Sequence, residues 1–464
     1  MEFTSLGSAA DASDISLVDT VRLTYAHGFV ADENALVMSI DNGSTRRISG
    51  FTSNNIRVVD ITRPDNVLEI TQAIKVNNET DGSYSVDVQV EGATFRQVHK
   101  LLTFADNSVS SADDVKQNQP STWGSQTAGA DYVIIANGAL KAAVEPLAAL
   151  RSNRGMVVQV VDVEDLYDEF TFGRHSPQAI HDYLAHAMNT WTRKPHYALL
   201  AGDASYDPKN YLDHGLNDLV PTKLIDTNLM EAASDDWLAD FNNDGMADIA
   251  LGRLPVRTAA DMEALVAKVL NYENAAPDPS RGALLVADTG FEEPSSALKS
   301  LLPRRMTVAT INRRSADDAT IHDQVVSAIN QGPRVTNFVG HGSNGVWTGG
   351  SVLSSFDAPA LTNTNRLSVF TMMTCFNGYF QDAYNDSLSE ALLKAPGGAV
   401  AVWASTTLTE PAGQNVIDQE FYRLLFGAQP ATLGDAARLA KAVTTDRDVR
   451  RTWTLFGDPA MRLR

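Results

Sequence analysis

The chain has 464 residues, of which 44% are hydrophobic and 20% are charged, as is usual for soluble globular proteins. This length predicts about two to three domains and can bury a substantial core without disulfides. The formal net charge of −20, from 57 acidic against 37 basic residues, argues against nucleic acid or an anionic membrane as the main partner. No stretch approaches the roughly twenty apolar residues of a membrane span. The first residues lack the basic-then-apolar pattern of a secretory signal.

Residues 1–125 predict an accessory all-β domain of the sandwich or jelly-roll type. Short runs alternate polar with apolar residues, and Asp41–Gly43 and Asn78–Gly82 supply turns. The range contains no catalytic constellation, so we expect it to pack beside the rest of the chain or to present substrate. A linker is expected at Asn107–Thr127, which is rich in Ser, Asp, Gln and Thr. The expected strands are Thr20–Tyr25, Ala35–Ile40, Ile56–Ile61, Ser83–Val90 and His99–Phe104.

From Asp131 onward, predicted strands alternate with predicted helices. Such alternation indicates βαβ units and an α/β fold with a mostly parallel sheet flanked by helices. Ser176 followed by Pro177 is typical of a helix N-cap with proline at the first helical position. The first expected elements are the strand Tyr132–Asn137, the helix Ala139–Arg151, the strand Met156–Val161, the helix Pro177–Trp191 and the strand His196–Asp203.

An Asp-rich stretch before the next strand has the spacing of a metal-binding loop. Asp240, Asn242 and Asp244 fall on alternate positions, Gly245 follows the third of them, and Asp248 comes three residues after that glycine. This resembles the first half of an EF-hand loop, in which oxygen ligands at alternate residues converge on Ca²⁺. The closing bidentate Glu is missing, which excludes a complete EF-hand. The alternative is an Asx-rich turn.

Two apolar runs in the last third of the chain each end on one reactive side chain. Val335–Gly340 leads into His341, and Leu367–Thr374 leads into Cys375, the only cysteine of the chain. Such runs predict buried parallel strands, and open α/β sheets carry their chemistry at the carboxyl ends of these strands. A histidine and a cysteine leaving two strand ends can form a thiolate–imidazolium pair.

Gly342 directly follows the histidine, so its backbone N–H is not obstructed by a side chain. With the N–H of Cys375 it can form an oxyanion hole, the preorganised donor pair that acyl transfer needs. Taken singly, each reactive residue has a structural alternative, because a lone cysteine is usually a small buried hydrophobe and a lone histidine a satisfied polar residue. The paired placement favours catalysis. A zinc protease or an α/β-hydrolase is not indicated, since their sequence motifs are absent.

The residues around these two positions resemble the active-site signatures of the gingipain family of cysteine peptidases. Gly340–Ser343 followed by Trp347 is similar to the histidine signature, and Cys375–Gly378 followed by Phe380 to the cysteine signature. The likeness extends from about Asp131 to the end of the chain. Supporting matches lie at Asp248–Val256 and Leu455–Ala460.

The resemblance implies a caspase-like fold with a Cys–His dyad and no catalytic cofactor. Residues 126–278 would form a first caspase-like subdomain, and residues 279–464 a second one that carries the dyad. Asp288, at the end of a predicted strand, would orient the imidazole of His341; a cap or turn role is its alternative. The family further implies a secreted or surface-attached protein with a structural Ca²⁺ ion, which favours the metal interpretation of the Asp-rich loop.

We therefore predict a cysteine endopeptidase that acts on proteins or peptides. Cys375 attacks the scissile carbonyl, while His341 protonates the leaving amine and later activates water to hydrolyse the thioester. One alternative is a non-catalytic binding module on the same scaffold. Another is a protease limited to processing its own precursor.

The substrate pocket is expected to be walled by Trp347, Trp403, Ser405 and Glu410, with core packing as the alternative for these residues. Gingipains divide into arginine- and lysine-cleaving types by an acid in this pocket. Lys299 stands where the arginine-type acid would align, so the preferred residue is left open.

Overall fold

The structure is a computed structural model that describes residues 25–64, 66–72, 74–90, 98–111, 118, 120–213, 218–348 and 352–464. The chain divides into two compact units, Met1–Asn118 and Gln119–Arg464. The strand expected at Thr20–Tyr25 lies, except for Tyr25, outside the described residues. Within the described part of the chain, no helix has the length and apolarity needed to cross a membrane.

The N-terminal unit consists of antiparallel sheets that share one apolar core, as expected for an all-β domain. Its strands are β1 (Ala35–Asp41), β2 (Thr45–Phe51), β3 (Ile56–Asp60), β4 (Leu68–Glu69), β5 (Ile74–Asn78), β6 (Tyr84–Gln89) and β7 (Val98–Ala105). They form one sheet in the order β1-β7-β3-β4 and another in the order β2-β6-β5. Alternate residues of β7 face inward. Ile40 and Val58 of the first sheet meet Ile48 and Val86 of the second in one cluster, which is the packing of a β-sandwich.

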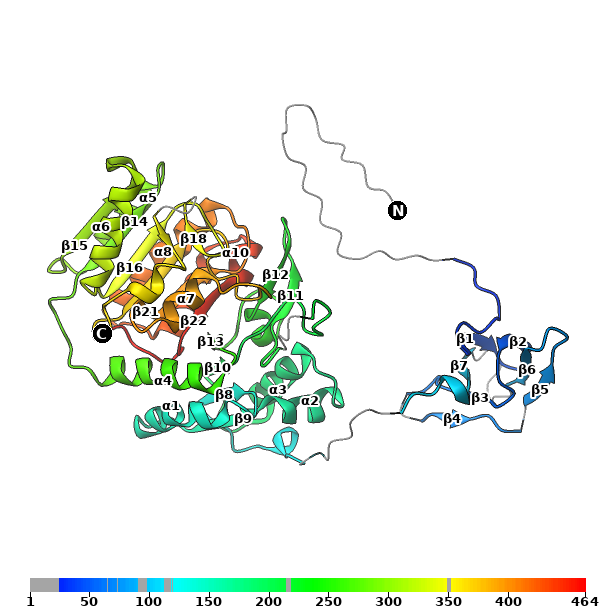
Figure 1. Cartoon of the computed structure of the whole chain (residues 1–464). Helices are drawn as coiled ribbons and strands as arrows, with labels where there is room; N and C mark the ends of the chain where they lie inside the picture. The colour runs from blue at the N-terminus through cyan, green and yellow to red at the C-terminus, as the bar shows by residue number, and fades with distance from the viewer. Residues whose placement is uncertain are drawn as a thin grey trace, which may run out of the picture. The chain divides into compact units, whose positions relative to one another are not determined.

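One ten-stranded sheet organises the second unit (Figure 1). Its strands are β8 (Tyr132–Ala136), β9 (Val158–Asp162), β10 (Tyr197–Ala201), β13 (Ala250–Leu254), β14 (Ala283–Ala287), β15 (Val308–Asn312), β16 (Val335–Val339), β20 (Ser368–Met373), β21 (Ala399–Ser405) and β22 (Trp453–Phe456). They lie in the order β15-β14-β16-β20-β21-β22-β13-β10-β8-β9. The small strands outside this sheet are β11 (Lys223–Asp226), β12 (Glu231–Ser234), β17 (Gly342–Ser343), β18 (Val346–Trp347) and β19 (Leu353–Ser354).

Strand directions divide the large sheet into two halves. Strands β14, β15, β16, β20 and β21 pair in parallel with one another, and so do β8, β9, β10 and β13. Strand β22 joins the halves, since it pairs antiparallel with β21 and parallel with β13. The expectation of a mostly parallel sheet is confirmed.

Helices cover both faces of the large sheet. Successive residues of β8 point to opposite faces, so that Tyr132 and Ile134 enter the larger core cluster with α1 and α4, whereas Val133 and Ile135 enter the smaller one with α2 and α3. The helices are α1 (Lys141–Asn153), α2 (Val163–Thr171), α3 (Pro177–Thr190), α4 (Ala259–Asn274), α5 (Glu292–Ala297), α6 (Asp318–Asn330), α7 (Leu388–Lys394), α8 (Pro411–Phe426), α9 (Leu433–Ala440) and α10 (Arg447–Thr452). The short 3₁₀ helices are η1 (Asp106–Ser108), η2 (Trp123–Ser125), η3 (Asp236–Ala239), η4 (Leu298–Ser300), η5 (Arg313–Ser315), η6 (Ala358–Ala360) and η7 (Lys441–Val443).

A buried charged network ties the C-terminal segment to the first half of the sheet. Arg151 donates to Asp458 at 2.9 and 2.6 Å and to Glu273 at 3.0 Å. The Tyr132 hydroxyl donates to the other Asp458 oxygen at 2.9 Å. All four side chains are buried, so each charge depends on its partners to offset the cost of leaving water.

Replacing Arg151 with methionine should destabilise the fold by about 3–5 kcal/mol, because it leaves the buried Asp458 carboxylate without its countercharge and Glu273 with Arg154 as its close cationic partner. Urea denaturation followed by circular dichroism measures this loss. Arg423→Met is the control, since Arg423 is exposed and paired with Glu420, and exposed ion pairs contribute about 0–1 kcal/mol. Equal midpoints for the two variants would contradict the assigned role of Arg151.

Candidate active site

His341 and Cys375 follow two neighbouring parallel strands, and each lies the same number of residues beyond the last strand pair. Strands β16 and β20 pair with Val339 opposite Met373, and the N–H of Gly340 donates to the Met373 carbonyl at 3.1 Å. Each reactive residue lies two positions beyond that pair in the sequence. The strand register therefore brings both to one edge of the sheet, where open α/β sheets hold their chemistry.

The loops that follow the two reactive residues are packed directly on each other. A Cβ atom added to Gly342 would lie 2.6 Å from Oγ1 of Thr374, so no larger residue fits there without a shift. The Asn377 amide donates to the Ser343 carbonyl at 2.6 Å and to the Val346 carbonyl at 3.1 Å. Asn377 belongs to the cysteine signature, but its role in joining the loops was not evident from the sequence.

The backbone turns sharply just after Cys375. Phe376 has a φ of 60°, a left-handed conformation that non-glycine residues rarely adopt. The Asn377 N–H donates to the Cys375 carbonyl at 2.8 Å, and the Phe376 N–H donates to the Thr407 carbonyl at 3.1 Å. Among the described residues, no hydrogen-bond acceptor is bound to the Cys375 N–H. This amide is therefore available to a substrate oxygen.

The thiol of Cys375 is partly buried. Burial raises its pKa, a backbone hydrogen bond with Thr409 lowers it, and the negative charge of Glu410 raises it. The sulfur lies 3.7 Å from the Thr409 carbonyl oxygen. Because the net shift is upward, the resting group is a thiol at neutral pH, and a neighbouring base has to remove its proton before it can attack.

His341 is exposed, and its ring packs edge-to-face against Phe291 with centroids 5.1 Å apart. Asp288, which is buried after β14, accepts a hydrogen bond from the His341 backbone N–H at 3.4 Å. The same carboxylate accepts from Arg313 at 3.3 Å. Asp288 is thus placed beside His341, but it contacts the backbone and not the imidazole that it was expected to orient.

The residues expected to wall the substrate pocket are not all at a surface. Trp347 and Trp403 are fully buried and stack on Phe338 and Phe421, with centroids 4.4 and 4.5 Å apart. Ser405 is buried as well, and its hydroxyl donates within its own loop. As placed, these three side chains offer no surface to a substrate, so core packing, the alternative, is what the structure shows.

Glu410, by contrast, is exposed and lines a cavity of about 930 Å³. The cavity is open to solvent and is lined by the β11–β12 hairpin, the first turns of α8 and the segment that leads into α10. Within it, Asp448 is paired with Arg451 at 3.0 Å. Among the described residues, the carboxylates of Glu410 and Asp226 have no hydrogen bond or ion pair. Glu410 directly follows Thr409, whose carbonyl oxygen lies 3.7 Å from the Cys375 sulfur, although Cys375 itself is not among the residues that line the cavity.

The Asp-rich loop is closed by its own backbone. Asp240 accepts from the N–H groups of Asp244 and Gly245 at 3.1 and 2.8 Å. Asn242 accepts from the Asp244 N–H at 2.9 Å, and Asp248 accepts a backbone hydrogen bond at 3.0 Å. In the described ranges, no group of three or more His, Cys, Asp or Glu side chains is arranged to hold a metal ion. As placed, the loop has the backbone hydrogen bonds of the Asx-turn alternative.

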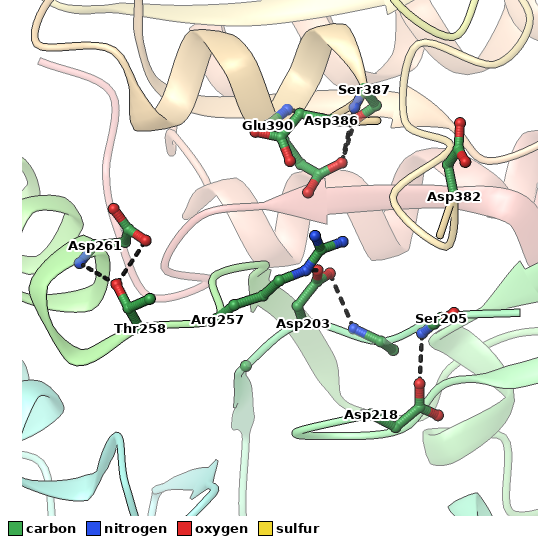
Figure 2. Close-up of polar contacts among 12 residues, drawn as sticks. Asp203, Ser205, Asp218, Arg257, Thr258, Asp261, Asp382, Asp386, Ser387 and Glu390 are labelled. Atoms are coloured by element: carbon green, nitrogen blue, oxygen red, sulfur yellow. Dashed lines mark hydrogen bonds and ion pairs between the residues drawn. The ribbon is translucent and has the colours of Figure 1, made fainter. Parts of the chain in front are cut away.

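Charged residues of α7, which begins shortly after the cysteine loop, lie near the Arg257–Asp203 ion pair from the first half of the sheet (Figure 2). Glu390 forms a capping box with Ser387 and accepts from Lys394 at 3.2 Å. Burial raises the pKa of Glu390 to about 8, the charge of Lys394 opposes this, and Asp203 adds to it. Arg257 donates to Asp203 at 2.6 Å. Sequence patterns gave no signal for this arrangement, because its members come from distant segments.

The chain is similar in sequence to known cysteine peptidases. The family model "Peptidase family C25" matches residues 125–464. Gingipain R2 of Porphyromonas gingivalis is 23% identical over 348 residues, which are 69% of this chain and 44% of that protein. Gingipain R1 of the same species is 23% identical over 340 residues, which are 68% of this chain and 32% of that protein. The chain thus spans less than half the length of these relatives.

Solved structures share the fold. The crystal structure of the Arg-specific cysteine proteinase gingipain R matches with a TM-score of 0.62 and 21% identity, over 73% of this chain and 79% of that one. Dimeric latent PorU from Porphyromonas gingivalis matches with a TM-score of 0.50 and 16% identity, over 94% of this chain and 39% of that one. The caspase-like fold of the gingipains is therefore the fold of the second unit. Because the family model matches well over half of its length, the chain belongs to peptidase family C25, the gingipain family of cysteine peptidases.

Proposed function

We propose that this protein is a cysteine endopeptidase that cleaves peptide bonds through a Cys375–His341 dyad. The observation that carries the proposal is the register of β16 and β20. It places these two residues, each two positions beyond the last strand pair, at one edge of the sheet. Membership of a peptidase family supports it. A non-catalytic binding module would not need both a cysteine and a histidine at these ends.

In the proposed mechanism, each group near the thiol has one role. His341 takes the proton of Cys375, and the thiolate attacks the scissile carbonyl carbon. The N–H groups of Gly342 and Cys375 donate to the oxyanion that forms. The imidazolium then gives its proton to the leaving amine as the C–N bond breaks, and His341 activates water to hydrolyse the thioester. Asp288 supports this site by holding the His341 backbone.

The cavity at Glu410 favours substrates with a basic side chain. The carboxylates of Glu410 and Asp226 line it, and a cation would provide the partner that neither has among the described residues. An arginine-specific relative has the same fold. Lys299 does not oppose this assignment, because its side chain is exposed on η4 rather than among the cavity's lining residues.

We further propose the wider setting of this activity. Residues 1–125 serve as an accessory domain, residues 126–278 as the first caspase-like subdomain and residues 279–464 as the catalytic one. The protein acts on protein or peptide substrates outside the cell or at its surface. Support comes from the family and from the all-β unit that precedes the peptidase unit.

Cys375→Ala and His341→Ala should each lower kcat by roughly 10³-fold or more, because nucleophile and base act as one unit. Hydrolysis of fluorogenic peptides by the full chain measures this, with thermal melting to show that the fold survives. His322→Ala is the control, since His322 pairs with Asp357 on another part of the unit. Undiminished cleavage by either dyad variant would reject the dyad.

Glu410→Gln should shift the alkylation of Cys375 by iodoacetamide to lower pH, because the charge that raises the thiol pKa is removed. The same variant should lose preference for Arg or Lys over Leu in peptide substrates. Glu420→Gln, on the helix that Glu410 precedes but outside the cavity, should change neither property. An unaltered alkylation profile together with an unaltered preference would remove Glu410 from the site.

Chelation by EDTA should leave the melting temperature unchanged, because among the described residues no three His, Cys, Asp or Glu side chains are arranged to hold a metal ion. Thermal melting with EDTA and with added CaCl₂ or MgCl₂ tests this. A decrease that Ca²⁺ reverses, and that Mg²⁺ does not, would instead support the calcium site predicted from the sequence.

A further inference from the structure

A polar pair lies in the core between the two strands that carry the reactive residues. Asn337 on β16 and Thr371 on β20 are register partners, and both are fully buried. The Asn337 Nδ2 donates to Thr371 Oγ1 at 2.9 Å. Each member lies four residues before the reactive residue at the end of its own strand, His341 or Cys375. The pair therefore links the two catalytic strands below the site.

Helix α8 holds this pair from one face of the sheet. Asp418, which is 2% exposed, accepts from the Asn337 Nδ2 at 3.1 and 2.9 Å through its two oxygens. One helical turn further along, the Tyr422 hydroxyl lies 3.1 Å from Thr371 Oγ1. Residues four apart lie on the same face of a helix, so one face of α8 holds both strands.

The first turn of the same helix holds the loop that covers the thiol. Gln414 donates to the carbonyl and to the hydroxyl of Thr409, both at 3.0 Å. The Thr409 carbonyl in turn accepts from the Cys375 thiol at 3.7 Å. The first turn of α8 is thus linked to Cys375 through Thr409, and the middle of the helix is hydrogen-bonded to β16 and β20. A shift of the helix would move Thr409 and Glu410 relative to Cys375.

Among the described residues, no cation acts on the Asp418 carboxyl. Burial raises its pKa to about 8, and the hydrogen bond from Asn337 lowers it only in part. Among the described residues, the titratable group that faces it is Tyr422 on its own helix, whose pKa is raised by burial and by Asp418. The strands β16 and β20 present only Asn337 and Thr371 to it. At neutral pH the group is mainly a carboxylic acid, because ionisation would leave a buried anion with one amide as its donor.

We propose that Asp418 is a positioning residue, which through Asn337 and Thr371 locks β16, β20 and α8 in the arrangement that holds His341 beside Cys375. Its ionisation at alkaline pH leaves an anion in this core with no cation beside it among the described residues, and this disturbs the site before the chain unfolds. The kinetic part rests on the proposed peptidase function, whereas the stability and thiol-labelling parts do not.

The first experiment tests the protonation state of Asp418 by measuring how the melting temperature depends on pH. A carboxyl whose pKa rises on folding costs stability as the pH increases from its ordinary value of 3.8 to its folded value of about 8. Asp418→Asn keeps the shape and a carbonyl acceptor but does not titrate. Its melting temperature relative to wild type should therefore rise steadily with pH across this window and then level off. A difference that is independent of pH would overturn the buried neutral acid.

The second experiment reads the site itself. Asp418→Ala should lower kcat by roughly 10-fold or more, since small misplacements of reacting groups are costly. It should also speed the labelling of Cys375 by iodoacetamide at pH 7, because burial and Glu410 both keep the thiol protonated. Asp418→Asn should have the kcat and the labelling rate of the wild type at pH 7. At alkaline pH it should keep its kcat, whereas the kcat of the wild type should fall.

Asp218→Asn is the matched control. Asp218 is a half-buried acid whose pKa burial raises to about 7, and its carboxylate accepts from the Ser205 N–H in the first half of the unit rather than from α8 or its strands. Its replacement should change the pH dependence of stability but neither labelling nor turnover. Wild-type labelling and turnover in folded Asp418→Ala would show that Asp418 is only structural. If no variant or wild type turns over, the labelling difference still decides the positioning role, independently of the peptidase proposal.

Discussion

The register between β16 and β20 is the constraint on which the site depends. A slip of one residue would send every side chain of a strand to the opposite face, and His341 would then no longer leave the sheet beside Cys375. The register is held by apolar residues buried on both faces of these strands and by the Asn337–Thr371 hydrogen bond inside the core. At the strand ends, the contact of Gly342 with Thr374 allows no extra atom.

Groups around Cys375 determine how readily its thiol loses a proton. The loop between β21 and α8 supplies Thr409 and Glu410, which with burial decide how readily the thiol ionises. Helix α7 begins at a buried capping box that is linked to charges from the first half of the sheet. Buried ion pairs contribute little net stability but are costly to break. They therefore act here as fixed supports for the loops, while apolar burial provides most of the folding energy.

Local patterns were enough to predict the alternating strands and helices, the Ser176 cap and the strand-end positions of the reactive residues. Helix α2 was missed because Asp162 both ends β9 and caps the helix, so no glycine or proline marks the boundary. The burial of Trp347 and Trp403 could not be predicted from their closeness to the motifs in the sequence, because it depends on stacking with Phe338 and Phe421. Helix α8 likewise meets the catalytic strands only through tertiary packing, which sequence spacing does not encode.

The most direct test of the account is covalent labelling by peptide chloromethylketones with Arg, Lys, Asp or Leu at the first position, read by intact mass. The account predicts one adduct per chain on Cys375, fastest with the basic peptides, and much slower labelling in His341→Ala. The chain has a single cysteine, so Cys375→Ala fixes the site of attachment. Absence of any adduct on the folded wild-type chain, or equal labelling without His341, would contradict a Cys375–His341 peptidase.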